Sequence, residues 1–312
     1  MKSIALPLLL AVLAALQGCA SMQQPTSDCP SSTHNASYTG PYKGMENQVG
    51  AADMARDFYC ADRFKAAKYP QGFVAIYGSS RIGESNSMQP DPAIRADHDK
   101  LYQGVRQFAQ QWTSLYGTRY PIMTGAGPGI MEAGNRGAKE AGGPSIGYTT
   151  YYGPSRDKGD ARLAFQQYKG QDIVTDGLVF SSVAAREAMM IVHSAAIVVA
   201  PGGSGTEWEI FQILESMKSQ QLTPVPIYLV GNKDRHWKSF DQRLRAMATL
   251  GTLRMNEVEG LFVYVENPED VVGLLQQQRL GLALGVAALH LGGSLLLTWL
   301  GLHSAALLLR SL

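Results

Sequence analysis

A glycine-rich segment followed directly by acidic residues is the part of the sequence best suited to chemistry. Residues 201–209 read Pro-Gly-Gly-Ser-Gly-Thr-Glu-Trp-Glu and follow a short apolar run at 197–200. Three glycines in four positions allow close approach of a ligand to the backbone, and the start of a helix attracts anions. Thr206 suits the N-cap of that helix, with Glu209 in the capping-box position. We therefore expect a phosphate or nucleotide site at Gly202, Gly203, Ser204, Gly205 and Thr206.

A second glycine loop, Gly-Ala-Gly-Pro-Gly at 125–129, follows the apolar run at 121–124. A dinucleotide site would need an acidic residue near the end of the next strand, and residues 146–150 contain none. Neither loop is followed by Gly-Lys-Ser or Gly-Lys-Thr, so triphosphate hydrolysis is disfavoured. Glycines required only by tight turns remain the alternative. If the two loops converge, a nucleoside monophosphate fits them best.

Arg186 and Glu209 are the candidate reactive side chains. They lie on the predicted helices before and after the strand at 197–200, so both side chains could approach one ligand. Arginine binds phosphate in a bidentate manner, and a carboxylate beside a sugar can stabilise an oxocarbenium-like centre or activate water. The alternatives are a surface arginine and a glutamate that only caps its helix.

The elements that must position these residues alternate regularly along the chain. Apolar runs rich in β-branched residues predict strands, and apolar residues spaced three and four apart predict helices. This order indicates an α/β, Rossmann-like doubly wound parallel sheet in a single domain. The first strand leads into Gly78 and Ser79, the usual entry to a ligand crevice. The strands are expected at 73–77, 121–124, 145–148, 174–180, 197–200, 226–230 and 261–265, and the helices at 48–69, 91–116, 130–141, 182–194, from 206 to about 218, 237–250 and 268–278.

The composition is that of a globular protein, and the two ends of the chain stand apart from it. The 312 residues carry a net charge of +1, with 45% hydrophobic and 17% charged residues, so nucleic-acid binding is not expected. Residues 1–19 resemble a signal peptide whose lipobox ends at Cys19, the candidate lipidation site. We expect a flexible tether at 20–45, the domain at 46–279, and a hydrophobic C-terminal segment at 280–312.

The two ends of the chain suggest where in the cell the protein is located. A lipid on Cys19 would anchor the protein to a membrane of the cell envelope, facing the periplasm; a cytoplasmic chain with an ordinary first helix is the alternative. Residues 280–312 are long enough to span a bilayer, although a helix packed on the domain or a fused tail would look similar. Cys29 and Cys60 could pair in an oxidising compartment or be unrelated thiols. The chain has no Cys-x-x-Cys and no His/Cys cluster, so a zinc site is not supported. We expect no metal and no cofactor.

Four ordered segments together resemble one family. Residues 201–209 match the PGGxGTxxE signature of the Lonely Guy (LOG) family, and Arg186 has the spacing of the family's arginine. Residues 124–138 are similar to its loop TGGGPGIMEAANRGA, and 74–81 to its first strand and turn. The resemblance covers roughly residues 72–279.

The resemblance implies a Rossmann-like homodimer that hydrolyses the N-glycosidic bond of a nucleoside 5′-monophosphate, either a cytokinin riboside monophosphate or an ordinary purine or pyrimidine nucleotide. Arg186 and Glu209 would be catalytic, and residues 202–206 would hold the phosphate. A non-catalytic carrier of a nucleotide or of molybdenum cofactor is the alternative. The family's older lysine decarboxylase label implies a cofactor-dependent reaction that the sequence does not support. The ribose and base side would be lined by Gly125, Ala126, Gly127, Pro128, Gly129 and Glu132.

The chain departs from the family pattern in three places. Glu187 replaces the lysine that usually follows the arginine, which reverses a charge beside the expected site. Ala126 replaces a glycine. Residues 151–171, expected to form a loop region beside the site, do not match the usual connection, so the base is left open.

Overall fold

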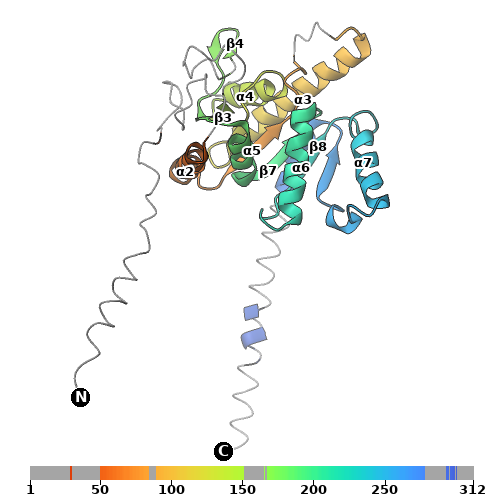
Figure 1. Ribbon diagram of the computed structural model, residues 1–312. Coiled ribbons are helices and arrows are strands. Elements are labelled where there is room, and N and C mark those ends of the chain that lie inside the picture. Colours follow the sequence, from red (N-terminus) through yellow and green to blue (C-terminus); the bar gives the residue numbers. More distant parts are fainter. Residues whose placement is uncertain are drawn as a thin grey trace, which may run out of the picture.

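Seven parallel strands form one sheet at the centre of the molecule (Figure 1). The computed structural model describes residues 29, 50–83, 89–150, 165, 167–277, 293–294, 296–298 and 300. The strand order is β6-β3-β2-β1-β7-β8-β9. The strands are β1 (Phe73–Tyr77), β2 (Ile122–Thr124), β3 (Ser145–Thr150), β6 (Asp176–Phe180), β7 (Ser194–Val199), β8 (Ile227–Val230) and β9 (Phe262–Val265).

Helices cover both faces of this sheet. Alternate residues of β1 point to opposite faces, so Val74 and Ile76 join one buried cluster while Phe73 and Tyr77 join the other. The first cluster is completed by α3 (Pro92–Tyr116) and α4 (Ile130–Glu140). The second is completed by α2 (Ala51–Lys68), α5 (Val183–Val192), α6 (Ser204–Lys218) and α7 (Lys238–Thr249). The expected α/β architecture with a parallel, Rossmann-like sheet is therefore confirmed.

The direction of strand addition reverses at β1. Val74 pairs with Ile122 of β2 on one side and with Ala196 of β7 on the other. In the first half of the chain, β2, β3 and β6 are added on one side of β1. In the second half, β7, β8 and β9 are added on the other side. In open parallel sheets, ligands bind at the carboxyl ends of the strands where such a reversal occurs. The fold thus places a crevice between the loops that follow β1 and β7.

The start of α6 differs from the sequence prediction. The helix begins at Ser204, with Gly203 as its N-cap and no side-chain capping bond. Thr206 therefore lies in the first turn and does not cap the helix, and Glu209 is not in the capping-box position. The reason is that the backbone of Gly203 is extended (φ −96°, ψ −154°), so the chain enters the helix immediately after the glycine pair.

The connection between β3 and β6 contains a small hairpin. Strands β4 (Gln167–Tyr168) and β5 (Gln171–Asp172) pair antiparallel in the region expected to form a loop. Most of that region, residues 151–164 and 166, lies outside the described residues.

The C-terminal part of the domain adds short helices to the predicted elements. A π-helix, Lys233–Trp237, leads into α7. A 3₁₀ turn, Met255–Glu257, precedes β9, and another, Pro268–Asp270, precedes a helical stretch at 271–277.

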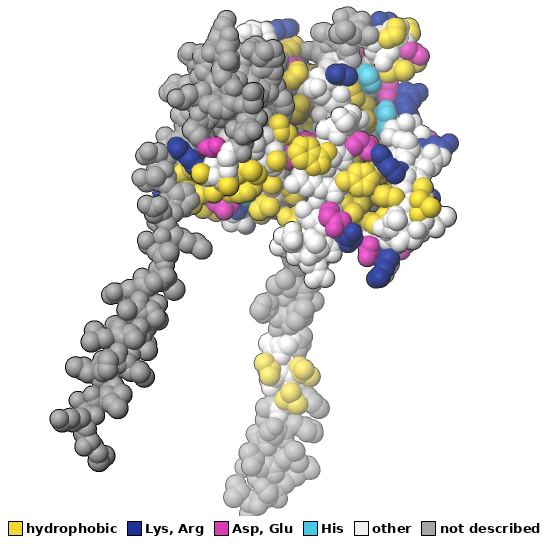
Figure 2. Space-filling view, in the orientation of Figure 1, with side chains coloured by type: hydrophobic (Ala, Val, Ile, Leu, Met, Phe, Trp, Pro, Cys, Tyr) yellow, Lys and Arg dark blue, Asp and Glu magenta, His cyan; other side chains and the backbone are white. Residues whose placement is uncertain are grey.

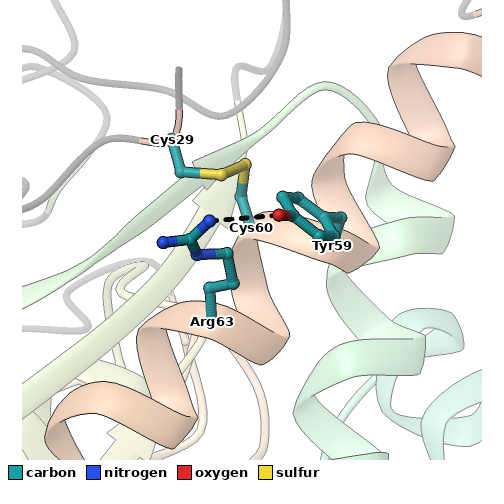
Figure 3. Close-up of a disulfide and its surroundings, with 4 residues drawn as sticks. All are labelled: Cys29, Tyr59, Cys60 and Arg63. Carbon is teal, nitrogen blue, oxygen red and sulfur yellow. Dashed lines mark hydrogen bonds between the residues drawn. A yellow bond between two sulfur atoms is a disulfide. The ribbon is translucent and has the colours of Figure 1, made fainter. Parts of the chain in front are cut away.

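A disulfide joins Cys29 to Cys60 of α2 (Figure 3). Beside it, Nη1 of Arg63 donates a hydrogen bond to the hydroxyl oxygen of Tyr59, 3.0 Å away. The pairing decides between the two alternatives that the sequence left open. It closes a loop of 31 residues, and closing a loop of this length stabilises a fold by about 3–4 kcal/mol.

The features expected at the two ends of the chain are largely untested. The signal peptide, Cys19 and the tether at 20–45 lie outside the described residues, apart from Cys29. Of residues 280–312, the structure describes 293–294, 296–298 and 300, all helical, with Leu296 and Leu297 exposed. Figure 2 shows hydrophobic side chains at the surface of the described part of this segment. No helix within the described part of the chain combines the length and the apolar character needed to cross a membrane.

Candidate active site

A cavity of about 770 Å³ opens at the carboxyl ends of the central strands. Its walls come from the loops after β1, β2 and β7 and from the first turns of α5 and α6. This is the position that the reversal of strand order predicts. A cavity of this volume is within the range that accommodates small-molecule ligands.

Backbone hydrogen bonds tie the three loops together. The N–H of Ile130 donates to the carbonyl of Ser79 at 3.1 Å, and the N–H of Ser79 donates to the carbonyl of Pro201 at 3.1 Å. Gly129 has φ +72°, and a side chain there would collide with the carbonyl oxygen of Ser79. Only glycine permits this close crossing of loops, so Gly129 shapes the site although it does not line it.

Arg186 reaches the cavity from α5. Ser182 caps this helix by accepting a hydrogen bond from the N–H of Ala185 at 3.1 Å, which fixes the first turn that carries Arg186. The guanidinium lies directly against Gly125, where an added Cβ would collide with Nη1. A side chain at this glycine of the second loop would therefore displace the guanidinium from its present position.

Nη2 of Arg186 contacts two carboxylates. It forms an ion pair with Oε1 of Glu187 and lies 3.7 Å from Oε1 of Glu209. All three side chains are buried. The guanidinium of Arg186 is therefore shared between the two carboxylates, and its closer contact is the ion pair with Glu187.

Glu209 has a pKa suited to proton transfer near neutral pH. Burial raises the pKa of its carboxyl group to about 7, and the nearby positive charge of Arg186 opposes that rise. Desolvation dominates because the charged form loses its hydration inside the protein. At neutral pH the group is present in both protonation states, so it can accept or donate a proton.

The start of α6 forms another wall. Ser204, Gly205 and Thr206 all line the cavity, and the first N–H groups of a helix have no partner within the helix. These groups and the positive end of the helix dipole favour a bound anion.

At Ala126 the second loop has a backbone conformation that accounts for the glycine of the family pattern. Ala126 has φ +54°, a conformation that favours glycine, and glycine is the residue that the LOG loop pattern has there. The N–H of Ala126 donates to Oγ1 of Thr124 at 2.9 Å, which holds the turn.

The structure brings most of the residues predicted from the sequence into this one cavity. Three do not line it: Gly129, Gly202 and Glu132. Glu132 points toward α3 and accepts a hydrogen bond from the hydroxyl of Tyr102 at 2.6 Å. The predicted residues that line the cavity are Gly78, Ser79, Gly125, Ala126, Gly127, Pro128, Arg186, Gly203, Ser204, Gly205, Thr206 and Glu209.

Sequence reasoning did not assign several other lining residues to the site. Arg81 and Trp208 had a signal, since each belongs to a segment already recognised as a ligand loop. Thr149 had none, because only folding brings it near the loops. Phe165 lies in the region at 151–171 that is expected beside the site, but nothing singles out this residue within it. The unassigned lining residues are Ser80, Arg81, Met131, Thr149, Phe165, Val183, Glu187 and Trp208. Within the described ranges, no group of three or more His, Cys, Asp or Glu residues could hold a metal ion.

Comparison with protein families assigns most of the domain. Residues 131–275 match the family model described as possible lysine decarboxylase. The match includes Arg186, Glu187 and the whole segment at 201–209.

Some solved structures show limited similarity. The molybdenum cofactor binding protein of Rippkaea orientalis aligns with a TM-score of 0.41 at 21% identity, over 66% of this chain and 96% of its own. The molybdenum cofactor carrier protein of Chlamydomonas reinhardtii aligns with a TM-score of 0.42 at 17% identity, over 66% and 96%. Scores at this level say nothing about the ligand of this chain.

Curated relatives match only a short stretch. Thirty-six residues, 12% of the chain, are 67% identical to the fluoride-specific ion channel of Paracidovorax citrulli, and 45 residues, 14% of the chain, are 51% identical to that of Variovorax paradoxus. These stretches span 29% and 36% of the channels, so the chain covers about a third of the length of these relatives.

Proposed function

The chain contains a domain of the LOG family, the family described by the lysine decarboxylase model, and from this premise we propose that it hydrolyses the N-glycosidic bond of a nucleoside 5′-monophosphate. The products are the free base and ribose 5-phosphate. The observation that carries the proposal is the buried pair of Arg186 and Glu209, 3.7 Å apart in the cavity.

In the proposed reaction, Glu209 activates the water molecule that attacks the sugar. As the C1′–N bond breaks, positive charge develops on the sugar ring, and a buried carboxylate stabilises that charge while accepting a proton from the attacking water. The electron pair of the broken bond goes to the base nitrogen. A pKa near 7 leaves a substantial share of Glu209 ionised at neutral pH.

The phosphate binds at the start of α6. Ser204, Gly205 and Thr206 offer first-turn N–H groups on the cavity wall, and Arg81 lines the same cavity. Both features favour a dianion. Arg186, already paired with Glu187, is left to orient Glu209 and the sugar.

The base binds against Trp208. Trp208 lines the cavity and is 45% exposed, so part of its surface is accessible to a ligand. Base stacking on an aromatic ring tolerates different bases, which is consistent with either a cytokinin or an ordinary purine as the leaving group.

Lysine decarboxylation fits the cavity poorly. Amino-acid decarboxylation through pyridoxal phosphate needs a lysine for the Schiff base, and the described residues that line the cavity include none.

The test is a screen of nucleoside monophosphates with the full chain. We expect base release from at least one of them, and we expect Glu209→Gln to lower kcat by roughly 100-fold or more, the contribution typical of general acid–base catalysis. Glu215→Gln, which changes a largely exposed carboxylate on the same helix, should retain full activity. A folded chain that releases no base from any monophosphate would rule out the proposal.

A second function has one observation in its favour. The Arg186–Glu187 ion pair leaves less positive charge for substrate than an arginine and lysine would. A protein that carries a nucleotide or molybdenum cofactor without cleaving it fits this arrangement. Ligand retained through purification and recovered intact after long incubation would support the carrier; rapid turnover would exclude it.

A further inference from the structure

Glu187 lines the cavity and has one buried carboxylate oxygen without a partner in the described part of the chain. The side chain lines the cavity and the residue is only 2% exposed. Its Oε1 pairs with Arg186, whereas its Oε2 is buried and has no hydrogen-bond partner among the described residues. A buried carboxylate oxygen without a donor is costly, and native proteins rarely leave one unsatisfied. A ligand in the cavity that brings a hydrogen-bond donor would satisfy it when the carboxylate turns toward the cavity.

The position of Glu187 indicates which part of the ligand that donor belongs to. Glu187 and Glu209 both contact Nη2 of Arg186, so the two carboxylates flank the same nitrogen. If Glu209 acts at the anomeric carbon C1′, Glu187 lies beside the sugar. The 2′-hydroxyl is on the carbon next to C1′ and is a hydrogen-bond donor. Hydrogen bonds to this hydroxyl also strengthen as a glycosidic bond breaks.

We propose that Oε2 of Glu187 accepts a hydrogen bond from the ribose 2′-hydroxyl, which makes Glu187 the residue that selects ribonucleotides over 2′-deoxyribonucleotides. This inference rests on the proposed function, because it places the sugar by the role of Glu209. It also gives a role to the charge reversal at position 187, because the lysine of the family pattern could not accept a hydrogen bond from this hydroxyl.

Binding of the two sugar phosphates tests the inference without relying on turnover. The affinities of the full chain for ribose 5-phosphate and 2-deoxyribose 5-phosphate would be measured by titration calorimetry. We expect ribose 5-phosphate to bind roughly 10- to 100-fold more tightly, the effect of one hydrogen bond to a charged group. Glu187→Ala should bring this ratio close to one, and Glu215→Gln should leave it unchanged.

A kinetic comparison adds a second measurement. The ratio of kcat/KM for the ribonucleotide to that for the 2′-deoxyribonucleotide should fall by the same factor in Glu187→Ala. A general loss of structure would lower both values and leave their ratio unchanged. If Glu187→Ala fails to fold, Glu187→Gln decides, because its amide oxygen can still accept the bond and should retain part of the preference.

The outcomes separate this inference from the proposed function. Equal binding of both sugar phosphates, binding of neither, or a preference that survives Glu187→Ala overturns the role of Glu187. Hydrolysis of ribonucleotides and deoxyribonucleotides at equal rates also overturns the role of Glu187, but it leaves the proposed hydrolytic function in place. A Glu187-dependent preference in binding with no hydrolysis supports the role of Glu187 and overturns the hydrolytic function.

Discussion

Oε1 of Glu209 lies 3.7 Å from Nη2 of Arg186, although the two residues are 23 positions apart on helices before and after β7. The strand between them brings the start of α6 next to the first turns of α5. Both side chains are removed from water, and burial of Glu209 outweighs the favourable charge of Arg186 in setting its pKa. The site therefore contains a carboxyl group whose ionisation lowers the free energy of unfolding.

The stability of the protein should depend on pH through Glu209. Its pKa is raised from 4.5 to about 7 by burial, so between these values the folded protein holds a proton that the unfolded chain releases. The free energy of unfolding should therefore fall as the pH rises through this interval. The contribution amounts to about 3 kcal/mol by pH 8.

Glu209→Gln tests this expectation, because glutamine does not ionise. Urea denaturation at pH 5 and pH 8 should show the variant more stable than the wild type at pH 8 by up to about 3 kcal/mol, with a much smaller difference at pH 5. Glu215→Gln is the control, since its carboxylate is largely exposed. Equal pH dependence in Glu209→Gln and the wild type would contradict the assignment.

Trp208 should contribute to substrate binding more than to the chemical step. Stacking of a base on an aromatic ring is worth about 1–3 kcal/mol, and the lower end applies to a side chain that is 45% exposed. We expect Trp208→Ala to raise KM about fivefold to tenfold with little change in kcat. Steady-state kinetics would measure both constants.

Trp208→Tyr provides the matched comparison, because it keeps an aromatic surface. It should retain most of the wild-type affinity. If Trp208→Ala lowers kcat and leaves KM unchanged, Trp208 does not hold the base.

The disulfide between Cys29 and Cys60 should raise the melting temperature of the domain. Cys29→Ser removes it while leaving the buried Cys60 in place. A loss of about 2–4 kcal/mol in a domain of this size corresponds to a decrease in Tm of roughly 5–15 °C. Scanning calorimetry of the wild type with and without reductant should reproduce the same difference. Free thiols at Cys29 and Cys60 in the untreated wild type would contradict the bond.

The order of elements and the main loops could be predicted because their signals are local. The apolar runs at 73–77 and 226–230 match β1 and β8 to within one residue, and glycines mark the loops at 125–129 and 201–205. The contact of Arg186 with Glu187 could not be predicted, since it depends on side-chain conformation inside a folded cavity.

Other features depend on contacts between segments far apart in the sequence. Phe165 lines the cavity from the region expected to form a loop beside the site, but that region has no periodic pattern to indicate which of its residues reaches the cavity. The start of α6 was misplaced by three residues because Thr206 and Glu209 fit a capping box, whereas the extended backbone at Gly203 begins the helix earlier.

The Cys29–Cys60 bond also determines how mechanical load enters the protein. Tension on the chain before residue 29 passes through the sulfur atoms into α2 and bypasses the residues between them. On that helix, Asp57 accepts a hydrogen bond from the N–H of Ser181 at 2.8 Å, immediately before the residue that caps α5. A pulling force on the N-terminal segment would therefore be carried by α2 to the residue before the α5 cap and, through the ion pair of Lys68 with Asp176, to the edge strand β6.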